Sequence, residues 1–373
     1  MTAARLRIGI GLNALAHRLA TDDIRAPGRD ALERAVLAAD AASLDFVTLD
    51  DRFGEDGDDA GRSPLDSVLF ASVLALRTTR IGLIPATTVS FREPFHLSTS
   101  IATLDHVSAG RAGWQPGVPP PQRAVELAQH SGSVVYGLDY ASRAALSADA
   151  ADAVEVARRL WDSWEDDAII RDVATGRFID RSKLHYVDFE GASFRVRGPS
   201  IVPRSPQGQP VVAIRTDDDA TLAWAAAQAD VVFFDATAPD DARAWLDRLR
   251  TASDKAGREP PRAYADFVIA FGESAARLPD ALPAPLFRGE PAELAARLAA
   301  LAQHGVEGVR LHPFDLERDL ATLVADVLPV LREAGHFRPD DDEPATLRAR
   351  LGLHAAPNRY ASASGDTEAR RHA

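Results

Sequence analysis

Small polar side chains gather at the ends of two short apolar segments. Asp50 and Asp51 close one apolar run, and Thr88 and Ser90 lie at the end of the next run along the chain. If these runs are parallel strands, their carboxyl ends meet at one edge, where α/β proteins bind their ligands. Small hydroxyls suit contact with a flat polar ligand, although threonine is also an ordinary strand residue. Because side chains alternate along a strand, only one of the two adjacent aspartates can face such a site.

His96 lies just past the second run, where a catalytic role and a purely structural role at a helix start are both open. The chain holds ten histidines but no H-E-x-x-H pattern, and it has no cysteine. Thiol chemistry is therefore excluded, and we expect no metal site.

A second candidate site follows the apolar run that ends at Arg215. Thr216 is a candidate N-cap for the next helix, whose first turn would hold the acidic run 217–219. Carboxylates there suit the helix dipole, but the same helix start is where a barrel commonly binds phosphate. Two like unit charges ~4 Å apart repel by about 1 kcal/mol in water and by several times more near a protein surface. Arg215 can offset one of the three aspartates, not all of them.

The segment 9–14, GIGLNA, fits a relaxed dinucleotide-binding fingerprint, G-x-G-x-x-A. That fingerprint requires an acidic residue about 20 residues later, at the end of the second strand. Here the second run ends at Asp50 and Asp51, which is too far along the chain. We therefore do not interpret this segment as a dinucleotide site.

The chain has 373 residues, of which 46% are hydrophobic and 26% are charged, an ordinary composition for a globular protein. Its formal net charge of −13 disfavours binding to nucleic acid or to anionic membranes. The N-terminus lacks a basic flank and a long apolar core, so we expect no signal peptide. No stretch reaches the ~20 apolar residues that a membrane span needs. These features predict a soluble, cytoplasmic protein.

Eight short apolar runs alternate with segments of helical periodicity. Polar and apolar residues do not strictly alternate within these runs, which is typical of parallel strands covered on both faces. The runs are residues 6–12, 45–51, 80–90, 111–118, 211–215, 230–236, 263–271 and 308–314. Between the second and third runs, Leu65, Leu69, Val73 and Leu76 recur near helical spacing. This order predicts an α/β fold, a (β/α)8 TIM barrel.

Two insertions interrupt this order. Residues 118–145 form a Pro-rich loop after the fourth strand, and as a βα loop it is expected to be a lid or wall of the site. Residues 165–209 precede the fifth strand and contain a predicted hairpin over 176–198. We expect a single barrel domain over residues 1–335, followed by a C-terminal extension, 336–373, that wraps the surface and frays at its end.

Four stretches resemble the luciferase-like flavin monooxygenases, and most closely the two-component branch that acts on nitrilotriacetate and dibenzothiophene sulfone. They are EPFHLSTSIATLDHVSAGRAGW (93–114), LWDSWEDD to PRSPQGQPVV (160–212), FRGEPAELAARLAALAQHGVEGVRLHP (287–313) and GHFRP to NRYA (335–361). The resemblance implies a barrel of the bacterial-luciferase type that binds reduced FMN from a separate flavin reductase. It also implies that O2 is used to oxygenate a small organic compound, and that the chain is a homo-oligomer, a dimer or tetramer.

By the same resemblance, Asp51, Thr88, Ser90 and His96 line the flavin site, with His96 as the catalytic candidate. Three positions depart from the family pattern. Gln115 stands in place of an asparagine, Leu146 and Ser147 stand in place of an Arg-Tyr pair, and AIRTDDDA (213–220) replaces a phosphate loop of small residues. Because they occupy altered positions, Gln115, Arg215 and Thr216 are included among the candidate cofactor-binding residues.

These departures leave more than one function open. The first is an FMN-dependent monooxygenase with an altered site. The second is a non-catalytic paralogue, a partner subunit or a small-molecule binder, that has lost tight flavin binding. A deazaflavin such as F420 in place of FMN is a third.

Overall fold

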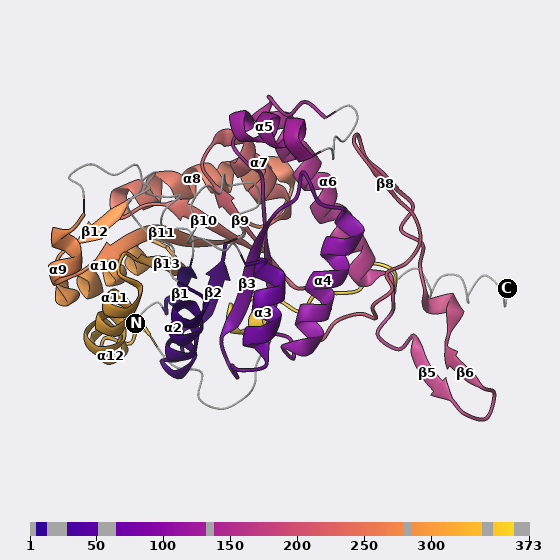
Figure 1. Ribbon diagram of the computed structural model, residues 1–373, viewed down its shortest axis with the longest axis horizontal. Coiled ribbons are helices and arrows are strands. Elements are labelled where there is room, and N and C mark those ends of the chain that lie inside the picture. Colours follow the sequence, from indigo (N-terminus) through magenta and orange to yellow (C-terminus); the bar gives the residue numbers. More distant parts are fainter. Residues whose placement is uncertain are drawn as a thin grey trace.

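The computed structural model describes residues 5–12, 28–50, 65–131, 138–278, 285–337 and 346–361. Eight parallel strands close into a barrel, which confirms the predicted architecture (Figure 1). In barrel order they are β1 (Arg7–Leu12), β2 (Phe46–Leu49), β3 (Gly82–Thr88), β4 (Gly113–Gly117), β9 (Val211–Thr216), β10 (Val231–Asp235), β11 (Arg262–Ala270) and β13 (Gly308–Pro313). Pairing of β10 with β11 and of β13 with β1 closes the ring. A further short strand, β12 (Leu286–Arg288), pairs with the C-terminal end of β11.

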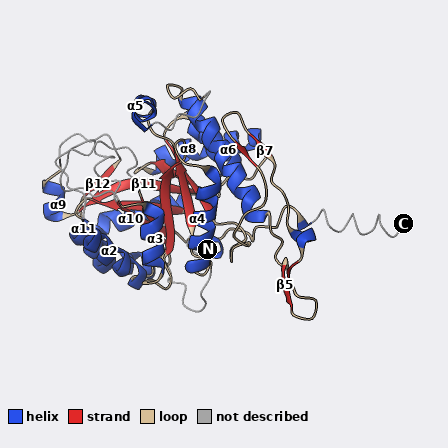
Figure 2. Cartoon of the chain, turned by 45° about the vertical axis from the view of Figure 1, so that its right-hand side comes forward, coloured by secondary structure: helices blue, strands red, loops and turns tan. Residues whose placement is uncertain are grey.

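Helices follow the strands and surround the barrel (Figure 2). They are α2 (Arg29–Ala41), α3 (Ser67–Ala75), α4 (Pro94–Val107), α6 (Arg143–Asp162), α7 (Asp219–Gln228), α8 (Pro239–Ala256), α9 (Gly272–Ala276), α10 (Pro291–Gln303), α11 (Leu316–Thr322), the π-helical η2 (Leu323–Val327) and α12 (Leu328–Glu333). Side chains cap several of them. Asp66 accepts hydrogen bonds from the first turn of α3, and Glu93 does the same for α4, whose first residue is a proline. Among the described residues, no helix combines the length and the apolar character that a membrane crossing requires.

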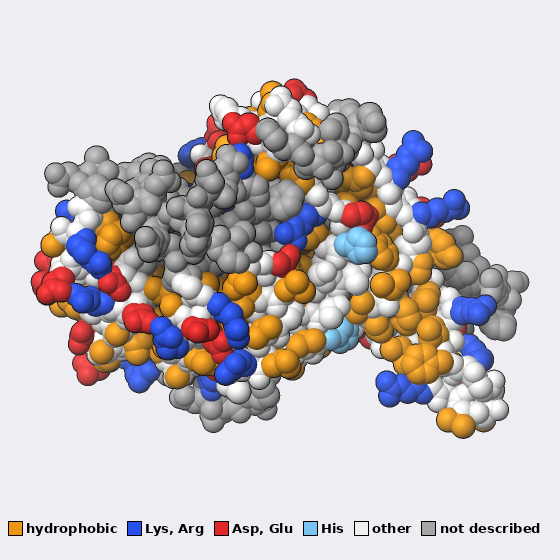
Figure 3. All heavy atoms as spheres, in the orientation of Figure 1, with side chains coloured by type: hydrophobic (Ala, Val, Ile, Leu, Met, Phe, Trp, Pro, Cys, Tyr) orange, Lys and Arg blue, Asp and Glu red, His pale blue; other side chains and the backbone are white. Residues whose placement is uncertain are grey.

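Helix α3 is apolar on both of its faces. Val68 and Leu74 point into the core, as expected for a barrel helix. Leu69, Val73 and Leu76 do occur at helical spacing, but their side chains are 70%, 43% and 77% exposed. Hydrophobic side chains are visible on the face of the molecule that carries α3 and α4 (Figure 3). We refer to Leu69, Val73 and Leu76 as the α3 stripe.

The two insertions lie where the sequence places them, after β4 and before β9. The first contains α5 (Pro121–Ser131), and its Tyr140 stacks on Phe91, with ring centroids 5.3 Å apart, so it packs against the loop that follows β3. The second holds two hairpins, not the single one predicted over 176–198. They are β5 (Ile169–Asp172) with β6 (Arg177–Ile179) and β7 (Phe189–Glu190) with β8 (Arg195–Val196), with the short helix η1 (Arg181–Lys183) between them. The β5–β6 hairpin projects from the body of the molecule (Figure 1).

The extension after the last barrel helix does not simply wrap the surface. Its short helix α13 (Leu347–Arg350) plugs the amino end of the barrel, where Leu347 and Leu351 pack beneath Phe46 and Tyr264. The fit is close, because a Cβ added at Gly82 would overlap the Leu347 side chain. The domain boundary at residue 335 stays a prediction, and the end of the extension, 362–373, lies outside the described residues.

The motifs that carry the family resemblance have mainly structural contacts. Asp105, in the first motif, accepts hydrogen bonds from the Ala112 amide and from the side chain of Gln207, in PRSPQG, at 3.2 and 2.6 Å. Gln207 in turn accepts one from the amide of Arg348 at 2.7 Å. Burial raises the pKa of Asp105, while the donated hydrogen bonds oppose this. The motifs therefore tie α4, the segment before β9 and α13 together.

Candidate active site

A charged cluster fills the carboxyl-terminal half of the barrel interior. Asp266 on β11 is fully buried and accepts two hydrogen bonds from Arg310 on β13, at 3.0 and 2.6 Å. His312, two residues further along β13, places Nε2 2.6 Å from the same carboxylate. Because a carboxylate only accepts, this imidazole nitrogen carries the proton. Arg310 Nη1 also donates to Gln115 Oε1 on β4 at 2.6 Å.

The neighbouring residues hold Arg310 and His312 in place. The guanidinium carbon of Arg310 lies 3.9 Å from the centroid of the Phe233 ring, a close cation–π contact. Gly11 lies directly against the imidazole, because a Cβ at this position would overlap the His312 ring. Gly9 likewise lies against the Phe46 ring, so packing inside the barrel, and not a dinucleotide, explains both glycines at the start of GIGLNA.

Arg215 connects the cluster to the rim of the barrel. Its guanidinium donates to both carboxylate oxygens of Asp235, at 3.0 and 2.9 Å, and lies 3.4 Å from Asp266. Burial lowers the pKa of Arg215, but the carboxylates of Asp266 and Asp235 outweigh this and raise it overall. Arg215, expected to offset one aspartate of the acidic turn, therefore makes its ion pairs elsewhere.

Thr88, Ser90 and Gln115 lie near one another at the carboxyl ends of β3 and β4. Gln115 is paired in register with Ala86, and Thr88 with Gly117. The Ser90 hydroxyl is buried and has no hydrogen-bond partner within the described part of the chain. Such an orphaned hydroxyl is costly unless a ligand or water satisfies it. This part of the rim therefore offers polar groups to a bound molecule.

The remaining predicted residues are placed differently. His96 lies on the exposed first turn of α4, where its backbone amide donates to the Glu93 carboxylate at 2.8 Å. Its catalytic role stays a prediction. Asp51 falls outside the described residues. Asp50 is half-buried and, by alternation, belongs to the face of β2 that carries Thr48 in the barrel interior.

Thr216 is not the N-cap of the next helix. It is the buried last residue of β9, where its hydroxyl donates to the Phe233 carbonyl at 3.3 Å. The N-cap is Asp218, which accepts from the Thr221 amide at 2.7 Å in a capping box. Asp218 is preferred because it sits at the extended residue directly before the helix, whereas Thr216 is still in the strand.

The acidic turn is balanced by an arginine that the sequence reasoning missed. Arg143, at the start of α6, donates to Asp217 at 2.7 Å and to Asp218 at 2.9 Å. Arg248 pairs with Asp219 at 2.5 Å. Burial alone would raise the pKa of Asp218, but hydrogen bonds from Thr221 and the charge of Arg143 lower this pKa overall.

Three further residues of the cluster were also missed, although the sequence carried a signal for them. Arg310 and His312 are two positions apart in the last apolar run, so alternation puts both on one face of a strand. Asp266 is a lone charge within the apolar run AYADFVIAF. A charged residue inside a buried strand implies a partner, and those two residues are the ones that meet it.

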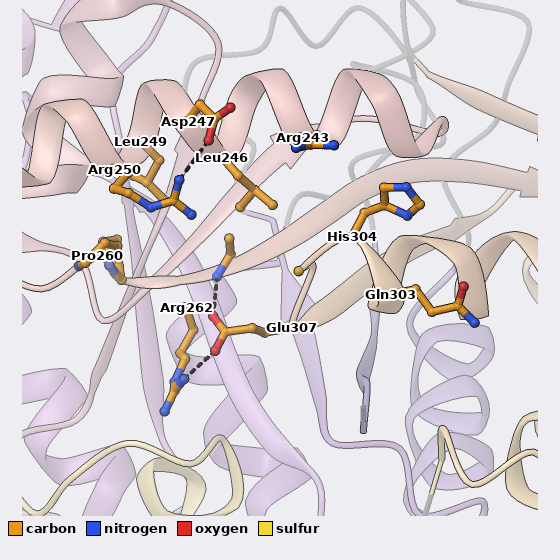
Figure 4. Close-up of a pocket in the computed structure, with 13 residues that line it drawn as sticks. Arg243, Leu246, Asp247, Leu249, Arg250, Pro260, Arg262, Gln303, His304 and Glu307 are labelled. Atoms are coloured by element: carbon orange, nitrogen blue, oxygen red, sulfur yellow. Dashed lines mark hydrogen bonds and ion pairs between the residues drawn. The ribbon is translucent and has the colours of Figure 1, made fainter. Parts of the chain in front are cut away.

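A separate cavity of about 740 Å³ opens at the amino end of the barrel (Figure 4). It lies between α8, the start of β11 and the loop after α10, and its main charges are paired with each other. Arg250 donates to Asp247 at 2.7 Å, and Arg262 pairs with Glu307. It lies at the end of the barrel away from the charged cluster, so it is not part of the candidate site. Among the described residues, no group of three or more His, Asp or Glu side chains could hold a metal ion.

Comparison with known proteins decides the family. Residues 10–319 match the luciferase-like monooxygenase family. The chain belongs to this family. It is 31% identical over 349 residues to a pristinamycin IIA synthase subunit of Streptomyces pristinaespiralis, covering 92% of this chain and 96% of that protein. It is 36% identical over 191 residues to N-acetyl-S-(2-succino)cysteine monooxygenase of Bacillus subtilis (strain 168), covering 51% of this chain and only 42% of that protein.

The resemblance to the branch of the family is confirmed as well, since nitrilotriacetate monooxygenase component A of Aminobacter aminovorans and dibenzothiophene-sulfone monooxygenase of Rhodococcus erythropolis also match. The chain spans 62% of the length of the second of these. The crystal structure of a long-chain alkane monooxygenase superimposes with a TM-score of 0.79 at 20% identity, over 93% of this chain and 95% of that one, which supports the fold. Luciferase-like monooxygenases are flavin-dependent and typically use FMN.

Proposed function

We propose that this protein is an FMN-dependent monooxygenase that oxygenates a small organic compound with reduced flavin and O2. The main support is the polar rim formed by Thr88, Ser90 and Gln115, at the barrel edge where the luciferase-like family is expected to bind its flavin. Bound FMN would supply the activation of O2. The protein's own groups orient the ring and exclude water, which is their usual part in cofactor catalysis.

The described residues fit a flat, polar ring at this rim. Ser90 offers a buried hydroxyl without a partner among the described residues. Next to Gln115 on the same face of β4, Gly117 leaves open space, because the nearest atom to an added Cβ is the Thr87 carbonyl oxygen, 3.7 Å away. The Ser147 hydroxyl on α6 is buried and likewise lacks a partner in the described part of the chain.

The phosphate end of FMN fits less simply. The turn before α7 presents Asp217 and Asp218, which oppose a phosphate, and Arg143, which attracts one. Arg143 also reaches the carbonyls of Val118 and Pro119, so it joins the first insertion to this turn. A phosphate there would have to compete with both aspartates for the same guanidinium.

Anaerobic titration of the purified protein with reduced FMN tests the proposal. Saturable binding is expected, and Asp217→Ser should tighten it about fivefold, since removing one nearby charge at a surface is worth about 1 kcal/mol. Asp219→Ser is the matched control, because Asp219 is 91% exposed and pairs with Arg248. An affinity no tighter than about 1 mM, unchanged by Asp217→Ser or Gln115→Asn, would overturn the proposal.

A non-catalytic partner subunit is the second candidate. It is favoured by the acidic turn, whose carboxylates already satisfy Arg143, and by the similarity to a protein named as a synthase subunit over nearly its full length. The titration separates the two functions, because a subunit without tight flavin binding would not saturate. A deazaflavin such as F420 in place of FMN is tested by repeating the titration with that cofactor.

We further propose that a separate flavin reductase supplies the reduced FMN and that the chain forms a homo-oligomer. The relative named as component A of a nitrilotriacetate monooxygenase supports a divided system. The α3 stripe supports self-association, because three large apolar side chains in line on a surface helix commonly mark an interface.

A further inference from the structure

Gln115 is held in one orientation by its neighbour. Its side-chain oxygen accepts a hydrogen bond from Arg310 Nη1 at 2.6 Å. A guanidinium has only donors, so the amide cannot turn its NH2 group toward Arg310. The oxygen end of Gln115 therefore faces the barrel interior, and the NH2 end is left to donate elsewhere.

Arg310 is itself fixed, so this orientation is not a chance arrangement of two flexible side chains. Asp266 receives its guanidinium in a two-pronged contact at 3.0 and 2.6 Å, and the Phe233 ring lies against its face. Arg310 is 2% exposed and Asp266 is fully buried. Charged hydrogen bonds of this kind, shielded from water, are strong and directional.

The strand that carries Gln115 leaves room at the mouth of the barrel. Gln115 is half-buried on β4, next to the end of β3 that carries Thr88. Gly117 follows on the same face of the strand and has no side chain to fill the mouth of the barrel. Because the oxygen of Gln115 is taken by Arg310 inside the barrel, its NH2 group is the end left for a ligand at this rim.

We propose that Arg310, held by Asp266, is a positioning residue that makes Gln115 a dedicated hydrogen-bond donor to the ligand. This inference rests on the proposed function, in which the ligand is FMN. The rim then selects the ring edge that presents carbonyl oxygens. The NH of a reduced flavin's central ring cannot accept from Gln115. Because reduced flavin carries more negative charge than oxidised flavin, a donor backed by a guanidinium binds the reduced form preferentially.

Three substitutions test this proposal. Gln115→Glu keeps the size and the contact to Arg310 but removes the donor, so affinity for reduced FMN should fall at least about tenfold. Gln115→Met removes the whole amide, and its affinity for reduced FMN should fall by only about threefold, because methionine adds no repulsion. Arg310→Lys cannot hold Asp266 and Gln115 together and should narrow the preference for reduced over oxidised FMN.

Two measurements keep this inference separate from the proposed function. The first is titration of each variant with reduced and with oxidised FMN, with thermal unfolding as the check on folding. The second is the side-chain amide signal of Gln115 in 15N NMR of the ligand-free protein, identified by its loss in Gln115→Met. We expect Arg310→Lys to shift or broaden this signal.

The outcomes are distinct. If the wild type binds FMN and the Gln115 variants match it within about twofold, the donor role is wrong while the proposed function stands. If the Gln115 amide signal is unchanged in Arg310→Lys, the positioning role is wrong whatever binds. If the wild type does not bind FMN, the proposed function and the ligand assignment fail together, and only the amide orientation is retained.

Discussion

At the scale of single residues, the barrel interior depends on paired charges. Arg310 and Asp266 are almost completely removed from water, and each compensates for the other. Such a pair adds little net stability compared with an apolar core, but breaking it by removing one partner is costly. Removing Asp266 should therefore disturb the site and destabilise the fold at the same time.

We therefore expect Asp266→Asn to lower the free energy of unfolding by about 3 kcal/mol, because it leaves the Arg310 charge buried without its counter-charge. Urea denaturation at neutral pH measures this. Asp235→Asn is the matched control: this aspartate also pairs with an arginine of the cluster, but its side chain is 35% exposed, so a loss of under about 1 kcal/mol is expected. Equal losses in the two variants would contradict the argument.

Asp45 gives a prediction about pH. It is buried, and although Arg7 and the Ile8 amide oppose the effect, burial raises its pKa from 3.8 to about 6. An aspartate with a raised pKa binds its proton more tightly in the folded state than in the unfolded chain. Its contribution to stability is therefore fully present below about pH 3.8 and is lost as the pH rises through 6.

The substitution Asp45→Asn removes this titration. We expect the variant and the wild type to have similar free energies of unfolding near pH 4, and the variant to gain by up to about 3 kcal/mol by pH 7. Denaturant titrations at both pH values give the difference, from which groups common to both proteins cancel. A difference that does not change with pH would show that folding does not raise the pKa of Asp45.

The sequence predicted single residues well where position along a strand decides their place. Thr88, Ser90 and Gln115 lie at the rim as expected, because strand ends could be read from the apolar runs. The sequence did not predict which residues form ion pairs with the charged side chains. Arg143 meets the acidic turn across 74 and 75 residues of sequence, and no local pattern encodes such a contact.

At the scale of elements, the Arg111 side chain links the end of one helix to the start of the next strand. Its guanidinium donates to the carbonyls of Ala75 and Thr78, at the end of α3, and of Ile81, before β3, at 2.8 to 3.1 Å. The Ala75 carbonyl is one of those that a helix leaves unsatisfied at its C-terminus. The motif GRAGW is therefore a clamp between elements rather than part of the site.

Arg111→Met should lower the free energy of unfolding by about 3 kcal/mol, because several buried carbonyls lose their donor. Arg77→Met is the control. It removes an arginine just after the same helix, but one that is 53% exposed, and its partner Glu33 keeps a second arginine, Arg29, at 3.6 Å, so about 0.5 kcal/mol is expected. Comparable losses for both arginines would mean that the clamp contributes nothing beyond a surface ion pair.

Helix α13 carries the second prediction at this scale. Leu347→Ala should cost about 3 kcal/mol, since it empties the plug beneath Phe46 and Tyr264. Leu353→Ala, at a partly buried residue of the same segment, should cost clearly less. Thermal and urea unfolding of the two variants decide between a plug and a loosely attached tail, for which both changes would be small.

The elements themselves were largely predictable, and the exceptions have physical causes. Continuous apolar runs identified all eight barrel strands, since parallel strands are buried on both faces. The second insertion was predicted as one hairpin and forms two, because both turns lie in a polar segment without strong periodicity. Apolar spacing also predicted α3 but could not show which of its faces is buried, as both are apolar.

At the scale of the whole molecule, the net charge and the exposed apolar surface have opposite effects on self-association. The net charge of −13 keeps separate molecules apart at long range, which favours solubility. The α3 stripe, in contrast, exposes Leu69 and Leu76 by 70% and 77%, and Val107 at the end of the neighbouring helix α4 is 41% exposed. Short-range burial of apolar area commonly outweighs modest charge repulsion in stable dimers, especially at physiological salt.

We therefore expect the purified protein to be a dimer or larger homo-oligomer, and Leu69→Glu combined with Leu76→Glu to shift it to monomer. Association would remove two carboxylates per copy from water. The free-energy cost of this desolvation is far larger than the stabilisation from the apolar contact. Light scattering coupled to size exclusion gives the mass. Val173→Glu on the β5–β6 hairpin is the control, because Val173 is 94% exposed but lies away from α3.

If the double variant keeps the wild-type mass while Val173→Glu yields monomer, the interface is on the projecting hairpin. If neither substitution changes an oligomeric mass, some other surface holds the copies together.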